Sequence, residues 1–121
     1  MRRFPLSLAA TCSAVLPLCL AACFSDAPLP AAPRPSPTAD VTASSTANIF
    51  SPTTVTIAKG GSVTWTIGTR NHNVTFVQTA GAPANIPTAT NATATRQFPQ
   101  AGTFAYVCSL HAGMVGTVVV Q

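Results

Sequence analysis

The chain has 121 residues, the length of a single domain, and only 7% of them are charged. Six Lys and Arg residues cannot form the basic stripe that nucleic-acid binding requires, so we expect no nucleic-acid partner. From residue 46 onward the chain contains no carboxylate side chain, which removes the groups that acid-base hydrolysis most often uses. We therefore expect that the protein is not an enzyme.

Residues 1–22 have the pattern of an export signal. Two arginines follow Met1, and an apolar run without charge extends from residue 4 to residue 22. The run ends in Leu20-Ala21-Ala22-Cys23, which resembles the bacterial lipobox, where the Cys becomes the lipidated first residue of the mature protein. An ordinary secretory peptide is the alternative. A transmembrane helix is disfavoured because the run is short and contains prolines.

The lipobox changes the interpretation of the four cysteines. Cys12 and Cys19 would leave with the signal, and Cys23 would carry lipid, so Cys108 remains as the free thiol and no disulfide is expected. We expect an exported, extracytoplasmic protein that is anchored to the membrane through Cys23. Phe24, rather than Asp, follows Cys23, which resembles lipoproteins sorted to the outer membrane in a host with two membranes.

Residues 23–45 are rich in Ala, Pro, Ser and Thr. Closely spaced prolines favour extended polyproline segments without a packed core. At roughly 3 Å per residue such a tether could hold a domain up to ~60 Å from a lipid surface. We therefore expect the folded domain to comprise residues 46–121.

In residues 46–121, apolar side chains alternate with Thr and other small polar residues, which is typical of half-buried strands. Residues 59–62, Lys-Gly-Gly-Ser, are predicted to form a hairpin turn, and residues 79–91 a loop with an edge strand. The pattern predicts an all-β Greek-key β-sandwich of about seven strands. Phe104, Tyr106 and Cys108 have the same parity, so a buried Phe104 would point Cys108 inward as well.

Candidate metal ligands are concentrated near the C-terminus, with the spacing Cys108-x-x-His111-x-x-Met114. His72 is the only other histidine in the chain. Two imidazole nitrogens, a thiolate and a weak axial thioether are the donors of a blue-copper electron-transfer site. Taken singly, each residue could be a buried apolar or a polar loop residue. Their joint occurrence predicts one copper ion, and zinc is disfavoured because a thioether is a poor zinc ligand.

These residues also carry a family resemblance. Residues 103–120 are similar to the C-terminal strand, ligand loop and strand of the cupredoxins, and His72-Asn73 resembles their upstream ligand. The plastocyanin, pseudoazurin and amicyanin group is nearest, and the short spacing between His111 and Met114 is amicyanin-like. The resemblance covers residues 47–121. It implies a cupredoxin fold with His72, Cys108, His111 and Met114 on the copper.

The resemblance also implies roles for neighbours of the ligands. Asn73 is expected to brace the Cys108 loop through Ser109. Leu110 departs from the family pattern, which usually has Pro before the second His. Proline has no backbone N–H, whereas Leu110 can offer one to the Cys108 sulfur.

The first functional hypothesis is a monomeric one-electron carrier that cycles between Cu(I) and Cu(II), because the protein ligands leave no open position for a substrate. Redox protein partners would dock at the apolar patch around His111, as the resemblance implies. The alternative is an envelope protein for copper storage or delivery, although such proteins tend to carry several exposed Met or His residues. A third hypothesis is an adhesive sandwich whose ligand pattern is coincidental.

Overall fold

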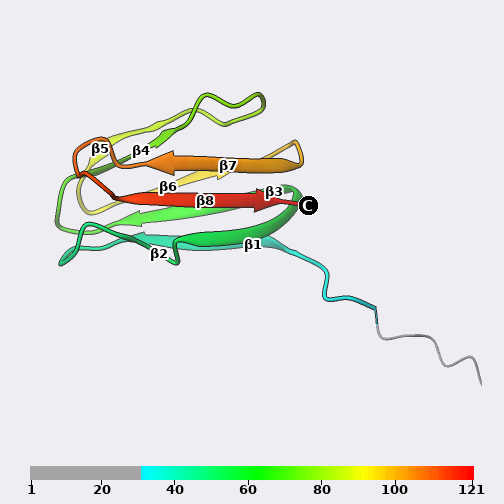
Figure 1. The fold of residues 1–121 in the computed structure, drawn as a ribbon. Helices are drawn as coiled ribbons and strands as arrows, with labels where there is room; N and C mark the ends of the chain where they lie inside the picture. Colours follow the sequence, from blue (N-terminus) through cyan, green and yellow to red (C-terminus); the bar gives the residue numbers. More distant parts are fainter. Residues whose placement is uncertain (1–30) are drawn as a thin grey trace, which may run out of the picture. The chain divides into compact units, whose positions relative to one another are not determined.

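The computed structural model describes residues 31–121, and the expected signal segment and Cys23 lie outside these residues. The described part contains only strands as regular elements: β1 (Ser36–Ala43), β2 (Phe50–Ser51), β3 (Thr54–Ile67), β4 (His72–Phe76), β5 (Ile86–Ala89), β6 (Ala92–Gln97), β7 (Gly102–Val107) and β8 (Val115–Val120). The expected all-β class is confirmed (Figure 1). Within residues 31–121, no helix is long and apolar enough to cross a membrane.

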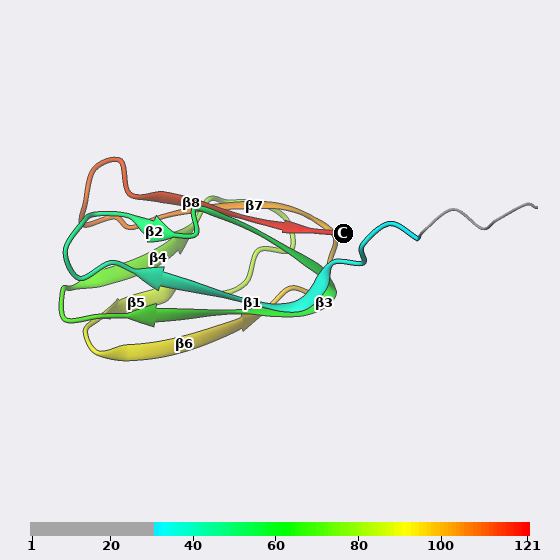
Figure 2. The ribbon, with the colours of Figure 1, turned by 90° about the horizontal axis from the view of Figure 1, so that it is seen from below.

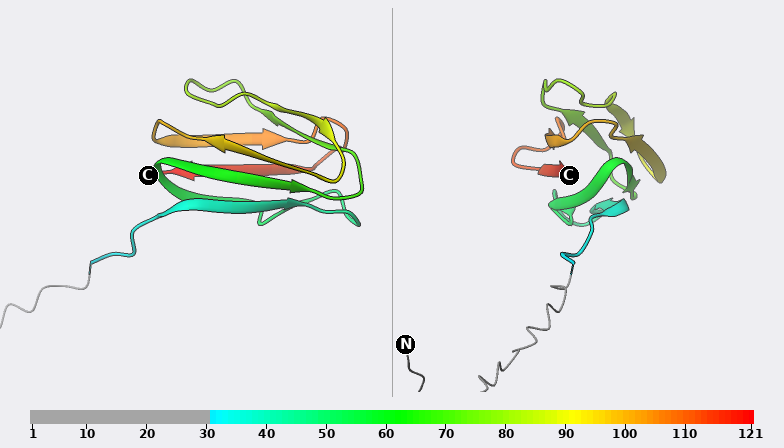
Figure 3. Two further views of the ribbon diagram at one scale, coloured as in Figure 1. Left: turned by 180° about the vertical axis from the view of Figure 1, so that it is seen from behind. Right: turned by 90° about the vertical axis from the view of Figure 1, so that its right-hand side faces the viewer.

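The strands form two layers that share β3. Hydrogen bonds connect them in the order β2-β1-β3-β8-β7-β4-β5, and β6 pairs with β3 outside this path. The first part of β3 pairs in parallel with β8, and its last part lies between β1 and β6. Figures 2 and 3 show β7 and β8 opposite β1, β6 and the end of β3. This arrangement is the expected β-sandwich.

The predicted hairpin turn at residues 59–62 is wrong. These residues lie inside β3, a strand of 14 residues that bends and exchanges partners instead of reversing direction. Gly60 has a φ of 81°, a conformation that glycine adopts without steric cost. A Cβ on Gly61 would collide with the backbone oxygen of Pro37 in β1 and lie 2.8 Å from that of Ala58. The glycine pair therefore permits a bend and a close approach of β1.

The folded domain begins before residue 46, the boundary expected from the sequence. Residues 36–43 lie in the segment predicted to be a tether, but they form β1 and pair in parallel with β3 from Thr38↔Ser62 to Ala43↔Ile67. Val41 and Ala43 are buried against the core. The physical reason is that this segment alternates apolar and polar side chains, a strand pattern that its proline-rich surroundings obscured.

The core lies between the layers and is largely aromatic. Trp65 is fully buried, and its ring lies 5.4 Å from Tyr106 and 5.8 Å from Phe76 between centroids. Phe104, Tyr106 and Cys108 are each at most 2% exposed, which confirms the parity argument. Packing of the β7 side chains therefore fixes the direction in which the Cys108 thiol points.

Gly61→Ala should destabilise the domain by about 2–3 kcal/mol, because the added methyl group meets backbone that cannot move independently. Urea unfolding followed by Trp65 fluorescence measures this loss. Ser62→Ala is the matched control and should change stability by less than about 0.5 kcal/mol. Equal stability of the two variants would contradict the close approach of β1 and β3.

Candidate metal centre

Three connections meet at one end of the sandwich: residues 44–49 between β1 and β2, residues 68–71 between β3 and β4, and residues 108–114 between β7 and β8 (Figure 1). His72 begins β4, and Cys108 follows the last residue of β7. Residues separated by 36 positions in the sequence are therefore brought together by the antiparallel pairing of β4 with β7.

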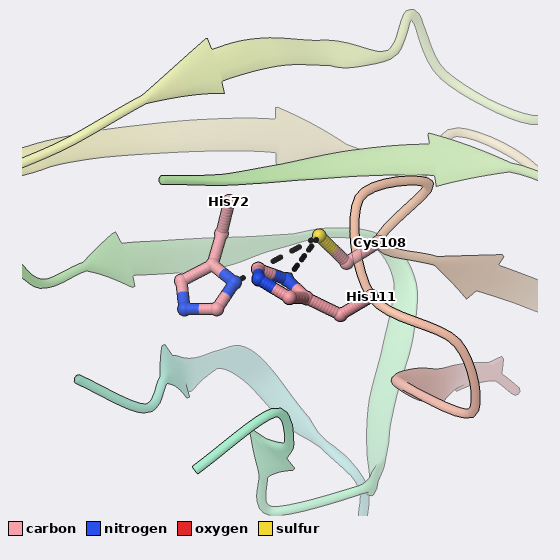
Figure 4. A group of neighbouring side chains, drawn as sticks. All are labelled: His72, Cys108 and His111. Carbon is pink, nitrogen blue, oxygen red and sulfur yellow. Dashed lines mark hydrogen bonds between the residues drawn. The ribbon is translucent and has the colours of Figure 1, made fainter. Parts of the chain in front are cut away.

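His72, Cys108 and His111 form a compact group of donors. Their candidate ligand atoms all lie within 4.8 Å of one another (Figure 4). Cys108 Sγ is 3.8 Å from His72 Nδ1 and 3.4 Å from His111 Nδ1. Donors at ~2.0 Å for nitrogen and ~2.3 Å for sulfur, placed 120° apart, are separated by ~3.7 Å. The observed separations fit a single metal ion between the three side chains.

His72 is oriented by a backbone carbonyl. Its side chain is fully buried, and its Nε2 lies 2.9 Å from the oxygen of Ser44. A carbonyl oxygen only accepts, so Nε2 carries the proton and donates it. The lone pair is then on Nδ1, which faces Cys108. Hydrogen bonding at one ring nitrogen thus presents the other to a metal, as is usual for histidine ligands.

His111 lies on a tight loop and is only half-buried. The loop is closed by hydrogen bonds from Cys108 N to Met114 O (2.9 Å) and from Met114 N to His111 O (3.2 Å). Gly113 has a φ of 79°, which a loop of this length needs at that turn. Partial desolvation lowers the pKa of His111, and its electrostatic interactions with His72 and Arg70 lower this pKa further. Both effects favour the neutral imidazole that binds metals.

Met114 and Cys108 supply the two sulfur atoms of the predicted set. Met114 is the last residue of the ligand loop, directly before β8, and its side chain is fully buried. Cys108 is a buried free thiol. The other three cysteines lie outside the described residues, so the expected absence of a disulfide stays a prediction.

Of the three residues next to the donors, Asn73 and Ser109 are hydrogen-bonded to each other, whereas Leu110 is exposed to solvent. Asn73 and Ser109 share two hydrogen bonds, from Asn73 Nδ2 to Ser109 Oγ (2.7 Å) and from Ser109 N to Asn73 Oδ1 (2.8 Å). They connect β4 to the start of the ligand loop. Leu110 is instead 49% exposed at the tip of that loop.

Ser44 is a contributor to the site that the sequence does not predict. It contributes through its backbone oxygen, which any residue carries, so residue identity could not indicate this role. The side chains of this loop add further support: Ser44 Oγ accepts from Ala47 N (3.0 Å), and Ser45 Oγ accepts from Thr69 N (3.2 Å). Ser44 and Ser45 also lie in the segment that the sequence predicts to be a tether.

Comparison with known proteins agrees with the fold and with copper as the metal. Residues 37–121 match the family described as copper binding proteins, plastocyanin/azurin family. The chain is 40% identical over 96 residues to a chloroplastic plastocyanin of Tetradesmus obliquus, an alignment that covers 65% of this chain and 63% of that protein. The chain therefore spans less than two thirds of the length of this relative.

Two solved structures have similar folds. A reduced Cu(I) form of an amicyanin variant at pH 4 aligns with a TM-score of 0.59 and 27% identity, covering 69% of this chain and 82% of that chain. A purple cupredoxin from Nitrosopumilus maritimus aligns with a TM-score of 0.58 and 28% identity, covering 69% and 99%. The chain belongs to the plastocyanin/azurin family of copper-binding proteins. Family and donor set together assign a single copper ion as its cofactor.

Asn73→Ala should destabilise the protein by about 1–3 kcal/mol, because it removes both hydrogen bonds to Ser109 and leaves the Ser109 N–H without this acceptor. Urea unfolding of the metal-free protein measures the effect without a contribution from copper. Asn71→Ala is the matched control, since Asn71 is exposed in the preceding turn. Similar losses for both variants would contradict a bracing role for Asn73.

Proposed function

We propose that the protein is a one-electron carrier with a type 1 copper site formed by His72, Cys108, His111 and Met114. The convergence of one thiol and two imidazole nitrogens within 4.8 Å carries this proposal. Copper, when bound, supplies the exchange of one electron between Cu(I) and Cu(II). The chain holds the donors in place for both oxidation states, because His72 is fixed through Ser44 and the ligand loop through its own hydrogen bonds.

Storage or delivery of copper is the second candidate, and the burial of the site argues against it. His72, Cys108 and Met114 are each at most 2% exposed, so an accepting protein could reach only His111 directly. Delivery sites tend to be exposed and adaptable. An enzymatic role would need an open coordination position, which four protein ligands do not leave. The same fold does occur in an enzyme, since a copper-containing nitrite reductase from Thermus scotoductus aligns at 22% identity over 23% of its chain.

Electrons would enter and leave through His111. It is the half-buried member of the donor group, on a loop at the end of the sandwich. Leu110 in that loop, Val115 at the start of β8 and Ile49 before β2 are all about half exposed, at 49%, 52% and 53%. They lie in, or directly after, the connections at this end of the sandwich, and we call these three residues the apolar end. Redox partners would dock on it, and the protein itself would remain a monomer.

The protein would be exported and anchored through a lipid on Cys23. The lipobox-like sequence supports this part of the proposal. The chain enters the domain at Ser36, where β1 begins, and β1 then runs toward the end that carries the ligand loop (Figure 1). The proposed tether would therefore join the domain at the end of β1 that lies opposite the ligand loop. In a host with two membranes, we propose the outer membrane as its location.

Cys108→Ser should abolish the intense visible band of the copper-loaded protein, because that band requires a thiolate on the metal. An absorption spectrum after addition of Cu(II) is the measurement. Cys23→Ser is the matched control and should keep the band, since Cys23 belongs to the proposed anchor. Retention of the band in Cys108→Ser would remove this thiol from the site.

Cys23→Ala should abolish incorporation of labelled palmitate, because the proposed lipidation needs the Cys23 sulfur. Labelling of cells that express the wild-type chain or the variant measures it, with Cys19→Ala as control. Equal labelling of the wild type and Cys23→Ala would contradict the lipid anchor. Electron transfer by the copper site would remain possible in either case, so the two parts of the proposal are tested separately.

A further inference from the structure

β6 leaves one side of the sandwich open. Among the strands of residues 31–121 it pairs only with β3, and the register is unbroken over all six of its residues. Figure 2 shows it as the outermost strand of its layer. Just beyond β6, Phe98 N donates to the oxygen of Gly61 (2.9 Å), so hydrogen-bonded pairs with β3 alternate backwards from residue 98. Residues 93, 95 and 97 therefore direct their backbone N–H and C=O groups toward the open side.

The other edge strands of the described domain carry features that prevent further pairing. β2 has only two residues, and β5 has four, with Pro87 among them. The outer side of β1, beyond its short pairing with β2, carries Pro37 and the exposed carboxylate of Asp40. Short length, proline and charge are the usual protections of an edge strand. β6 has six residues, no proline and no register shift, so these protections do not apply to its backbone.

Arg96 lies on this open side. It belongs to the half-buried residues of β6 that face the other layer, because Ala94, two positions earlier, packs against the core. Its guanidinium reaches the connection before β5, where Nε donates to Ala84 O (2.7 Å) and Nη2 to Asn85 O (2.9 Å). Nη1 donates to Thr95 O (2.9 Å), one of the backbone acceptors of the open side. The side chain thus links the two layers beside β6 and occupies an acceptor of the free edge.

We propose that the open side of β6 is a pairing surface for a second copy of this chain, and that Arg96 keeps it closed. This inference rests on the monomer in the proposed function and names the residue that maintains it. The outward groups of one β6 match those of a second β6 that runs antiparallel, with Thr95 opposite itself and Thr93 opposite Gln97. Such a pairing uses the same surface on both copies, so it closes at a dimer.

Self-pairing would bring the two Arg96 side chains together. In this register Arg96 lies opposite Ala94 of the second copy and diagonal to its Arg96, roughly 7–8 Å away on the same face of the joined sheet. Two like charges at that separation, half-buried between the layers, disfavour the dimer. Pairing also competes with the bond from Arg96 to Thr95 O, because the dimer needs this oxygen for its central hydrogen bonds. An inward-pointing charge is a known protection of edge strands.

Arg96→Met should convert the monomer into a concentration-dependent dimer, because methionine keeps an apolar stem without the charge or the donors. Sedimentation equilibrium measures the average mass, which should rise toward twice the monomer mass in the variant and stay at the monomer mass in the wild type. All chains carry Cys23→Ala, so that a lipid cannot cause association. Arg34→Met, which removes the same charge just before β1, is the matched control and should stay monomeric. A monomeric Arg96→Met, or equal association of both variants, would overturn the proposal.

A second substitution distinguishes edge pairing from unspecific association of a loosened domain. Thr93→Pro removes an outward N–H at a position that gives β3 no hydrogen bond, which an edge strand tolerates. Combined with Arg96→Met, it should restore the monomer, and cooperative urea unfolding should show that this variant is folded. Association that persists in the combined variant would contradict pairing through β6.

Hydrogen exchange locates the contact. The N–H groups of Thr93 and Thr95 should exchange rapidly in the wild type and become protected in the Arg96→Met dimer. A dimer in which both groups still exchange rapidly would overturn the proposal. If Arg96→Met does not fold, Arg96→Gln, which keeps a donor for Ala84 O, gives the same test, and a monomer would again contradict the role of Arg96. These measurements involve no electron transfer, so a failure of the proposed copper function leaves their result unchanged.

Discussion

The metal centre depends on one hydrogen bond, from His72 Nε2 to the backbone oxygen of Ser44. It connects β4 to the loop between β1 and β2, and so joins the two layers at the end where the donors meet. Because this bond fixes the tautomer, the free lone pair on Nδ1 points toward Cys108. Without it, a buried imidazole could turn and present its N–H to the thiol.

Burial explains why this arrangement suits a fixed copper ion. Cys108 is directed inward by the alternation along β7, and Asn73 holds the following residue, Ser109, against β4. The positions of the donors are thus set by the strands and their hydrogen bonds. A site organised in this way changes little between oxidation states, whereas a delivery site needs ligands that can move to an acceptor.

The sequence predicted the strand class and the grouping of donors, because both follow from local patterns. The alternation of apolar and polar residues predicted the buried face of β7, and the spacing of Cys108, His111 and Met114 predicted the loop.

The two errors, the hairpin turn at residues 59–62 and the late start of the folded domain, have a different origin. Glycines at 60 and 61 are as compatible with a bend inside a strand as with a hairpin turn, and only the pairing partners decide between them. β1 was missed because proline-rich composition outweighed a short alternation, and its burial depends on contact with β3. The Ser44 carbonyl has no side-chain signature at all.

The residues proposed to hold the copper differ in burial from those proposed to contact a partner. His72, Cys108 and Met114 are buried and connected to the strands, so substitution there would disturb the fold as well as the site. Leu110, Val115 and Ile49 are about half exposed at the end of the sandwich that carries the half-buried His111. Changes at these positions would alter the charge and shape of the proposed docking surface at little cost in stability. Partner choice could therefore change by substitutions on this surface while the donor geometry stays constant.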